Sequence, residues 1–129
     1  MFIVAFDPGE TTGIAETDTE SKVVTGFQTR DASDIHELLK RQRGRMYRGQ
    51  SVLVLAENFV GGGYRTTAAI NTLKVLGFIE HFCTTSGVPV LIRAPQLRKA
   101  YVSKAKELVG DVHAADAVAH ILSYLDEME

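Results

Sequence analysis

The chain has 129 residues, a net charge of −2, 45% hydrophobic side chains and a single cysteine. This length suits one domain of ordinary size, so we expect a single domain over residues 1–129. One cysteine excludes an internal disulfide framework, and no apolar run approaches the roughly 20 residues that span a bilayer. The opening MFIVAFDPGE lacks the basic start and small-residue cleavage site of a signal peptide, so we expect a cytoplasmic protein.

The first part of the chain predicts three strands and a helix. Residues 2–6 are wholly apolar and end at the turn sequence Asp7-Pro8-Gly9, which is typical of a strand buried on both faces. Residues 12–17 and 22–28 predict two further strands joined as a hairpin. Residues 31–47 have the apolar spacing of a helix with one buried face.

The second part alternates strands with helices. Residues 51–56 and 88–92 predict two more buried strands, and residues 95–102 and 112–125 predict helices. Residues 66–85 predict a long helix that is apolar on more than one side, which indicates a second contact surface such as a dimer partner. Strands that alternate with helices after an initial hairpin predict an α/β domain with a mixed sheet.

Charge is distributed unevenly along the chain. Residues 1–39 carry a balance of −6, residues 40–106 a balance of +10, and residues 107–129 a balance of −6. A basic middle region predicts a surface that binds a polyanion such as nucleic acid. The alternative is an ordinary solvated face that happens to be basic.

Three acidic residues lie beside apolar segments. Asp7 and Glu57 each follow a predicted buried strand, and Asp116 lies in the first turns of the last helix. Each also has a separate explanation. Asp7 could be a turn residue, Glu57 a strand-end carboxylate that faces water, and Asp116 an acid that interacts with the helix dipole. Buried carboxylates are costly unless they are paired or bind a cation, and three that converge would suit Mg²⁺ or Mn²⁺. One metal site accounts for all three residues and is the favoured interpretation.

Two histidines share a face of the last helix with Asp116. His113 lies three residues before it, which makes His113 a candidate metal ligand or proton carrier. His120 lies a further turn along the helix, and we interpret it as a structural or surface residue.

Three segments, FIVAFDPGETTG, VLVLAENF and VHAADAVAHIL, resemble the RuvC-type Holliday junction resolvases of the ribonuclease H-like superfamily. The segments INTLKVLGFIEHF and GVPVLIRAPQLRKAYV extend the resemblance in order over nearly the whole chain. Actin-like ATPases and sugar kinases share the opening motif but need two such domains. The resemblance implies an α/β fold of the ribonuclease H-like type, with a five-stranded mixed sheet flanked by helices.

The same resemblance implies an activity. Asp7, Glu57 and Asp116 match the acidic metal ligands of the family, and His113 matches its fourth active-site position. These four residues would be both catalytic and metal-binding, with Mg²⁺ as cofactor, Mn²⁺ as a substitute, and two ions in each site. The implied reaction is hydrolysis of four-way DNA junctions by paired cuts that leave 5′-phosphates. The family's long helix implies a homodimer through residues 66–85.

Candidate DNA contacts fall into two groups. Four basic residues lie between the third buried strand and the last helix, and the loop after Glu57 holds two aromatic residues and one arginine. The predicted contacts are Phe59, Tyr64, Arg65, Arg98, Lys99, Lys104 and Lys106. Phe59 is about as well explained as a core anchor. The chain is shorter than bacterial family members, chiefly after residue 103, and is more similar to the compact phage type.

Two other functions remain open from the sequence. One is a ribonuclease H-like nuclease that processes RNA, because that group shares the fold and a similar opening motif. The other is a junction-binding protein without catalysis, against which the retention of all three acidic residues and His113 argues.

Overall fold

The computed structural model describes residues 1–59 and 66–129. In chain order the elements are β1 (Phe2–Asp7), β2 (Thr12–Asp18), β3 (Val24–Thr29), α1 (Ala32–Tyr47), β4 (Val52–Glu57), α2 (Thr67–Ser86), β5 (Val90–Arg93), the 3-10 helix η1 (Pro95–Tyr101), α3 (Val102–Leu108) and α4 (Val112–Glu127). The strands form one five-stranded sheet in the order β3-β2-β1-β4-β5. No helix in this described part of the chain is both long enough and apolar enough to cross a membrane.

The sheet is mixed, as the sequence predicts. β1, β2 and β3 form an antiparallel meander, whereas β4 and β5 lie parallel to β1. The parallel pair places Phe6 beside Ala56, so that β1 and β4 end next to one another. These two central strands are therefore neighbours, which is the condition for Asp7 and Glu57 to meet.

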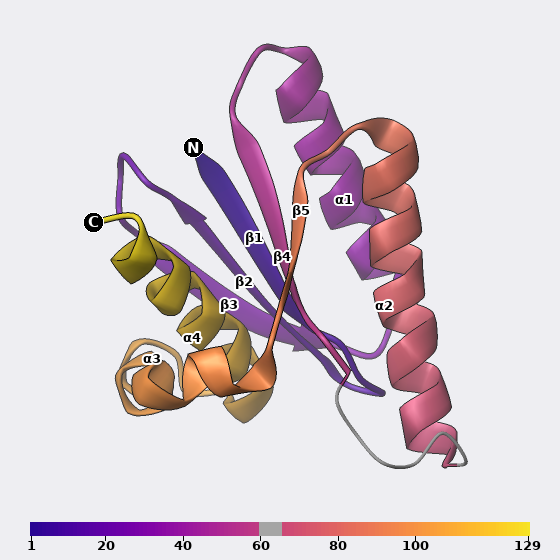
Figure 1. The fold of residues 1–129 in the computed structure, drawn as a ribbon, viewed down its shortest axis with the longest axis vertical. Helices are drawn as coiled ribbons and strands as arrows, with labels where there is room; N and C mark the ends of the chain where they lie inside the picture. Colours follow the sequence, from indigo (N-terminus) through magenta and orange to yellow (C-terminus); the bar gives the residue numbers. More distant parts are fainter. Residues whose placement is uncertain (60–65) are drawn as a thin grey trace.

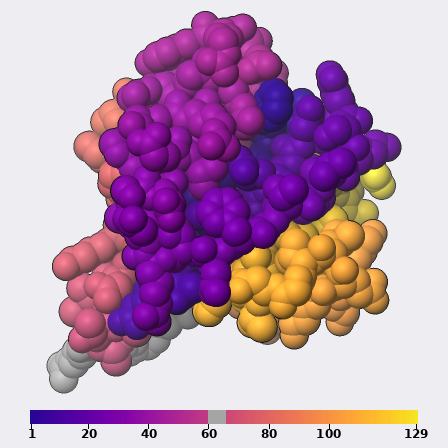
Figure 2. Space-filling model, turned by 180° about the vertical axis from the view of Figure 1, so that it is seen from behind, coloured from indigo at the N-terminus to yellow at the C-terminus, as the bar shows by residue number. Residues whose placement is uncertain are grey.

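Helices cover both faces of the sheet (Figure 1). α1 and α2 pack on one face, against Val4 of β1 and Val54 of β4, and α4 packs on the other face, against Ile3 and Leu53. Because side chains alternate along a strand, the odd-numbered residues of both β1 and β4 face α4. Figure 2 shows the other side of the molecule, where α1 and the α3–α4 segment cover separate parts of the surface.

Side-chain caps define where three helices begin. Asp31 accepts a hydrogen bond from the backbone N–H of Ser33 at α1. Thr66 does the same for Ala69 at α2, and Asp111 for Ala114 at α4. An N-cap of this kind satisfies a backbone donor that the helix itself leaves unpaired. The start of α4 is thus held in register, which matters because Asp116 lies in its second turn.

The structure differs from the expectations at three places. β5 is only partly buried, because it forms the edge of the sheet: Leu91 is 43% exposed and Ile92 is 37% exposed. The helix α3, after η1, was not predicted. The sequence pattern puts Leu73 of α2 on one apolar face, with Leu76, and Phe82 on another. In the structure Leu73 is exposed and Phe82 is buried, because Leu73 lies at the margin of the face that contacts the sheet.

Candidate active site

Two carboxylates meet at one end of the sheet. Asp7 and Glu57 are the last residues of the parallel neighbours β1 and β4, and both are odd-numbered and so face α4. Their side chains are hydrogen-bonded to each other. Two partly buried carboxyl groups that interact in this way repel each other when both are ionised, which favours retention of a proton by one of them.

Asp116 and Arg98 complete the cluster from the other layer. Arg98 of η1 donates a hydrogen bond from Nε to Oε1 of Glu57 at 2.5 Å. Its Nη1 lies 3.5 Å from Oδ1 of Asp116 on α4. The guanidinium of Arg98 thus lies between two of the three acidic groups and supplies part of the positive charge that they require.

The two strand-end carboxyl groups have opposite pKa shifts. Burial raises the pKa of Asp7 to about 8, and the hydrogen bond and negative charge of Glu57 add to this effect. Burial also favours the neutral form of Glu57, but hydrogen bonds from His120, Asp7 and Arg98 outweigh it and lower the pKa of Glu57 to about 2. In this arrangement Asp7 therefore keeps its proton near neutral pH and donates a hydrogen bond to the ionised Glu57.

The two histidines of α4 lie in different surroundings. His113 is exposed in the first turn of α4, and in the described residues its side chain makes no hydrogen bond or ion pair. His120 is only 1% exposed, and its Nε2 lies 2.9 Å from Oε1 of Glu57. The spacing of four residues between Asp116 and His120 put both on one helix face, but it did not identify the partner across from that face.

The chemistry of the cluster fits a divalent cation, although its arrangement is closed. Three carboxylates provide the oxygen ligands that Mg²⁺ and Mn²⁺ prefer. Burial is the main cause of the raised pKa of Asp7, and the negative charges of Glu57 and Asp116 raise it further, against the positive charge of Arg98. Among the residues described here, no three acidic, histidine or cysteine side chains are arranged as they would be around an ion. Arg98 pairs with Glu57 and Asp116, two of the three carboxylates that would hold such an ion.

A cleft opens beside the cluster. It has a volume of about 320 Å³ and is lined by Pro8, Glu57, Asn58, Phe59, Thr72, Pro95 and Arg98. Its walls come from the ends of β1 and β4, from α2 and from η1. A substrate in this cleft would approach Glu57 and Arg98 directly.

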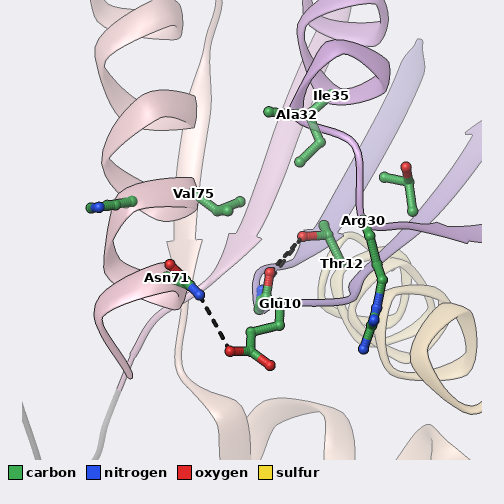
Figure 3. A pocket seen from close by; sticks show the side chains of 10 residues that line it. Glu10, Thr12, Arg30, Ala32, Ile35, Asn71 and Val75 are labelled. Carbon is green, nitrogen blue, oxygen red and sulfur yellow. Dashed lines mark hydrogen bonds between the residues drawn. The ribbon is translucent and has the colours of Figure 1, made fainter. Parts of the chain in front are cut away.

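A second hollow, of about 380 Å³, lies between the loop that follows β1, the start of α1 and one side of α2 (Figure 3). In it the side-chain amide of Asn71 on α2 donates to Oε1 of Glu10 at 3.3 Å. This bond ties the loop after Asp7 to α2. Arg30, which also lines the hollow, donates from Nε to Oγ1 of Thr11.

The predicted DNA contacts have different surroundings. Lys99, Lys104 and Lys106 are exposed and lie on η1 and α3, on the same connection as Arg98. Phe59 packs against the core between the sheet and α1 and α2, as expected for a core anchor. Tyr64 and Arg65 lie outside the described residues.

Part of the basic middle region has a structural role. Arg93 is buried and donates two hydrogen bonds to the carboxylate of Glu127. The guanidinium of Arg45 lies over the ring of Phe2, with 4.0 Å between its Cζ and the ring centre. These arginines stabilise the fold, so the count of basic residues overstates the charge available to a polyanion.

Solved structures with this fold include DNA junction resolvases. RuvC of Thermus thermophilus, alone and in complex with a Holliday junction substrate, matches with TM-scores of 0.63 and 0.64 at 19% identity, covering 95% of this chain and 92% and 91% of the RuvC chains. Fowlpox virus resolvase in complex with substrate Holliday junction DNA matches with a TM-score of 0.58 at 16% identity, covering 99% of each chain. No protein-family model and no curated protein matches the sequence. The chain thus has the ribonuclease H-like fold of RuvC-type resolvases, as the sequence predicts.

Proposed function

We propose that this protein is a metal-dependent endonuclease that resolves four-way DNA junctions by hydrolysing phosphodiester bonds in opposing strands. The observation that carries the proposal is the convergence of Asp7, Glu57 and Asp116 at one end of a RuvC-like sheet. Resolvases with this fold bind Holliday junction DNA in their solved complexes. The uneven charge along the chain supports a polyanionic substrate.

The proposed metal ligands are Asp7, Glu57 and Asp116, with His113 at the rim. Bound Mg²⁺ or Mn²⁺ would lower the pKa of water and stabilise the charge that develops during displacement at phosphorus. Asp7 would hold such an ion as the carboxylate, because a nearby positive charge favours the ionised form. His113 is exposed and unpaired within the described region, so its ring is free to turn toward an ion or to carry a proton.

Arg98 has two successive roles in this proposal. Without metal it compensates the charge of Glu57 and Asp116. Because Arg98 also lines the cleft, its guanidinium would be available to a phosphate of the DNA if a bound ion took over the charge of the acids. Lys99, Lys104 and Lys106 extend this contact along η1 and α3, where their side chains are exposed. The products are strands with a 5′-phosphate and a 3′-hydroxyl.

The proposed assembly is a homodimer formed by α2. Ile70, Leu73 and Phe78 are exposed on the outer side of this helix, around Gly77. A side chain at Gly77 would meet nothing within 4 Å, so the fold of one chain does not require glycine there. Glycine inside a helix costs about 1 kcal/mol relative to alanine, and a close crossing by a second helix would account for it. Two active sites related by a two-fold axis would suit a four-way junction.

The test is a nicking assay on a synthetic four-way junction, with linear duplex and an RNA–DNA hybrid as competing substrates. We expect cuts in opposing strands of the junction that require Mg²⁺ or Mn²⁺. Cleavage restricted to the hybrid would instead identify a nuclease acting on RNA. Tight binding of the junction without cleavage at any metal concentration would identify a non-catalytic junction-binding protein.

A further inference from the structure

The buried His120 makes one polar contact among the described residues, with Glu57. It lies on α4, one turn after Asp116, and its side chain is almost wholly buried. Its Nε2 lies 2.9 Å from Oε1 of Glu57, which is 63 residues away in the sequence. An imidazole in this position displaces an apolar side chain that would otherwise continue the packing of α4 on the sheet. The contact with Glu57 is therefore the feature that needs an explanation.

The geometry determines where the ring carries its proton. Nδ1 of His120 is buried and has no hydrogen-bond partner among the described residues. A proton on Nδ1 would be an unsatisfied buried donor, which is more costly than an unprotonated nitrogen. Nε2 faces a carboxylate oxygen and must donate to it. The tautomer with its hydrogen on Nε2 satisfies both conditions.

We propose that His120 is the positioning residue of the metal centre, and that it holds the carboxylate of Glu57 from the protein interior. This inference rests on the proposed function, in which Glu57 is a metal ligand. His120 itself is not a ligand, because its Nε2 is engaged by Glu57 and its Nδ1 is buried. Its donor fixes one oxygen of a side chain that otherwise rotates about three bonds. When Arg98 leaves Glu57, the bond from His120 remains and keeps the carboxylate oriented.

Hydrogen-bond partners of metal ligands typically change metal affinity by about 10- to 100-fold when they are removed. If His120 were purely structural, its substitution would lower the stability of the protein but leave the metal affinity of the folded site unchanged. Metal affinity therefore separates the two roles. Metal affinity is also a readout independent of DNA cleavage, which would be lost if DNA binding or any single catalytic group were impaired.

The test compares Mn²⁺ binding by titration calorimetry for the full chain and two variants. His120→Leu keeps a similar volume without a donor, and His120→Gln places an amide N–H near the position of Nε2. We expect His120→Leu to weaken Mn²⁺ binding by about 10- to 100-fold and His120→Gln to restore it to within about threefold. The melting temperature of each metal-free variant is measured alongside, to confirm that it is folded.

Two controls make the outcomes distinct. Asp7→Asn identifies the Mn²⁺ signal that belongs to the acidic cluster. Unchanged affinity in folded His120→Leu would overturn the positioning role while leaving the proposed function intact. If the unsubstituted protein gives no Mn²⁺ signal that Asp7→Asn removes, both the positioning role and the proposed function are overturned. If His120→Leu does not fold, His120→Asn takes its place, since its shorter amide does not reach Glu57 and the same loss of affinity relative to His120→Gln is expected.

Discussion

Gly13 of β2 lies directly against the backbone of His113, so closely that an added Cβ would come within 1.9 Å of the His113 carbonyl oxygen. Gly13 is also the residue that pairs with Asp7 in the sheet. The first turn of α4 therefore rests on the strand beside Asp7, and only a residue without a side chain permits this approach. The contact brings Asp116, one turn further along, to the ends of β1 and β4.

Gly13→Ala is expected to displace the start of α4 and to abolish metal-dependent cleavage. The clash is with backbone atoms, which cannot rotate away, so we expect a loss of about 3 kcal/mol or more in the free energy of unfolding. Denaturant unfolding and the nicking assay measure the two effects. Gly110→Ala is the matched control, because a Cβ there meets nothing within 4 Å. Equal stability of the two variants would show that α4 does not depend on this contact.

Asp7→Asn is expected to abolish cleavage while junction binding stays intact or becomes tighter. Asparagine retains the shape and a donor toward Glu57 but lacks the negative charge that a divalent ion requires. Nicking and gel-shift assays on the same preparation separate catalysis from binding. Loss of junction binding would mean that Asp7 serves the DNA interface or the fold rather than a metal.

The same variant should change how stability depends on pH in the absence of metal. The pKa of Asp7 is raised from 3.8 to about 8 in the folded protein, so the native state keeps a proton that the unfolded chain releases. Stability of the unsubstituted protein therefore falls as pH rises from about 4 to about 8, on the order of 1 kcal/mol per pH unit. Asp7→Asn should lack this decline and melt at a higher temperature at pH 8. Parallel pH profiles for the two proteins would contradict the shifted pKa.

Arg98→Gln is expected to destabilise the metal-free protein and to increase its stabilisation by Mn²⁺. The substitution removes the cation between Glu57 and Asp116, at a cost of about 2 kcal/mol for a lost hydrogen bond to a charged group. A divalent ion then has no internal competitor for the carboxylates. Thermal melts with and without Mn²⁺ measure both effects. Lys99→Gln is the matched control, because Lys99 is exposed and adjacent to Arg98. It should have the melting temperature of the unsubstituted protein both with and without Mn²⁺.

Charge exchange on α2 tests the proposed dimer. Lys74 and Glu80 lie three residues on either side of Gly77 and are both exposed. A two-fold axis at Gly77 would place Lys74 of one copy beside Glu80 of the other, and the reverse. Lys74→Glu or Glu80→Lys alone should weaken dimerisation by about tenfold, and the double exchange should restore it, as repulsion gives way to attraction. Analytical ultracentrifugation measures the dissociation constants, and equal weakening by the double variant would contradict this arrangement.

The sheet was predictable from the sequence because its central strands are short apolar runs with clear ends. Residues 2–6 and 51–56 differ from β1 and β4 by one residue at most at each boundary. The failure at β5 has a physical cause, since an apolar run does not reveal whether it lies at the centre or the edge of a sheet. Residues 102–108 were missed because a short helix with few apolar positions has no clear periodicity.

The acidic residues at the strand ends were also predictable, but their contacts were not. Asp7 and Glu57 stood out because a carboxylate directly after a buried run needs a partner. His120 was interpreted as structural or surface because helical spacing identifies a face and not what lies opposite it. Arg98 is a predicted DNA contact, and nothing in its local sequence indicates that it lies between two of the acidic side chains.

The sequence by itself determined the two central buried strands, the acidic residues that end them and how unevenly charge is distributed. These properties depend on residue type and short-range spacing, which act through burial and local backbone geometry. Only the tertiary structure decided that Asp7 and Glu57 face α4, because strands that are apolar on both sides carry no mark of which face is which. It also decided the partners of Glu57, since Arg98 and His120 are 41 and 63 residues away from it in the chain. Contacts over such separations arise from the packing of whole elements, which no local pattern encodes.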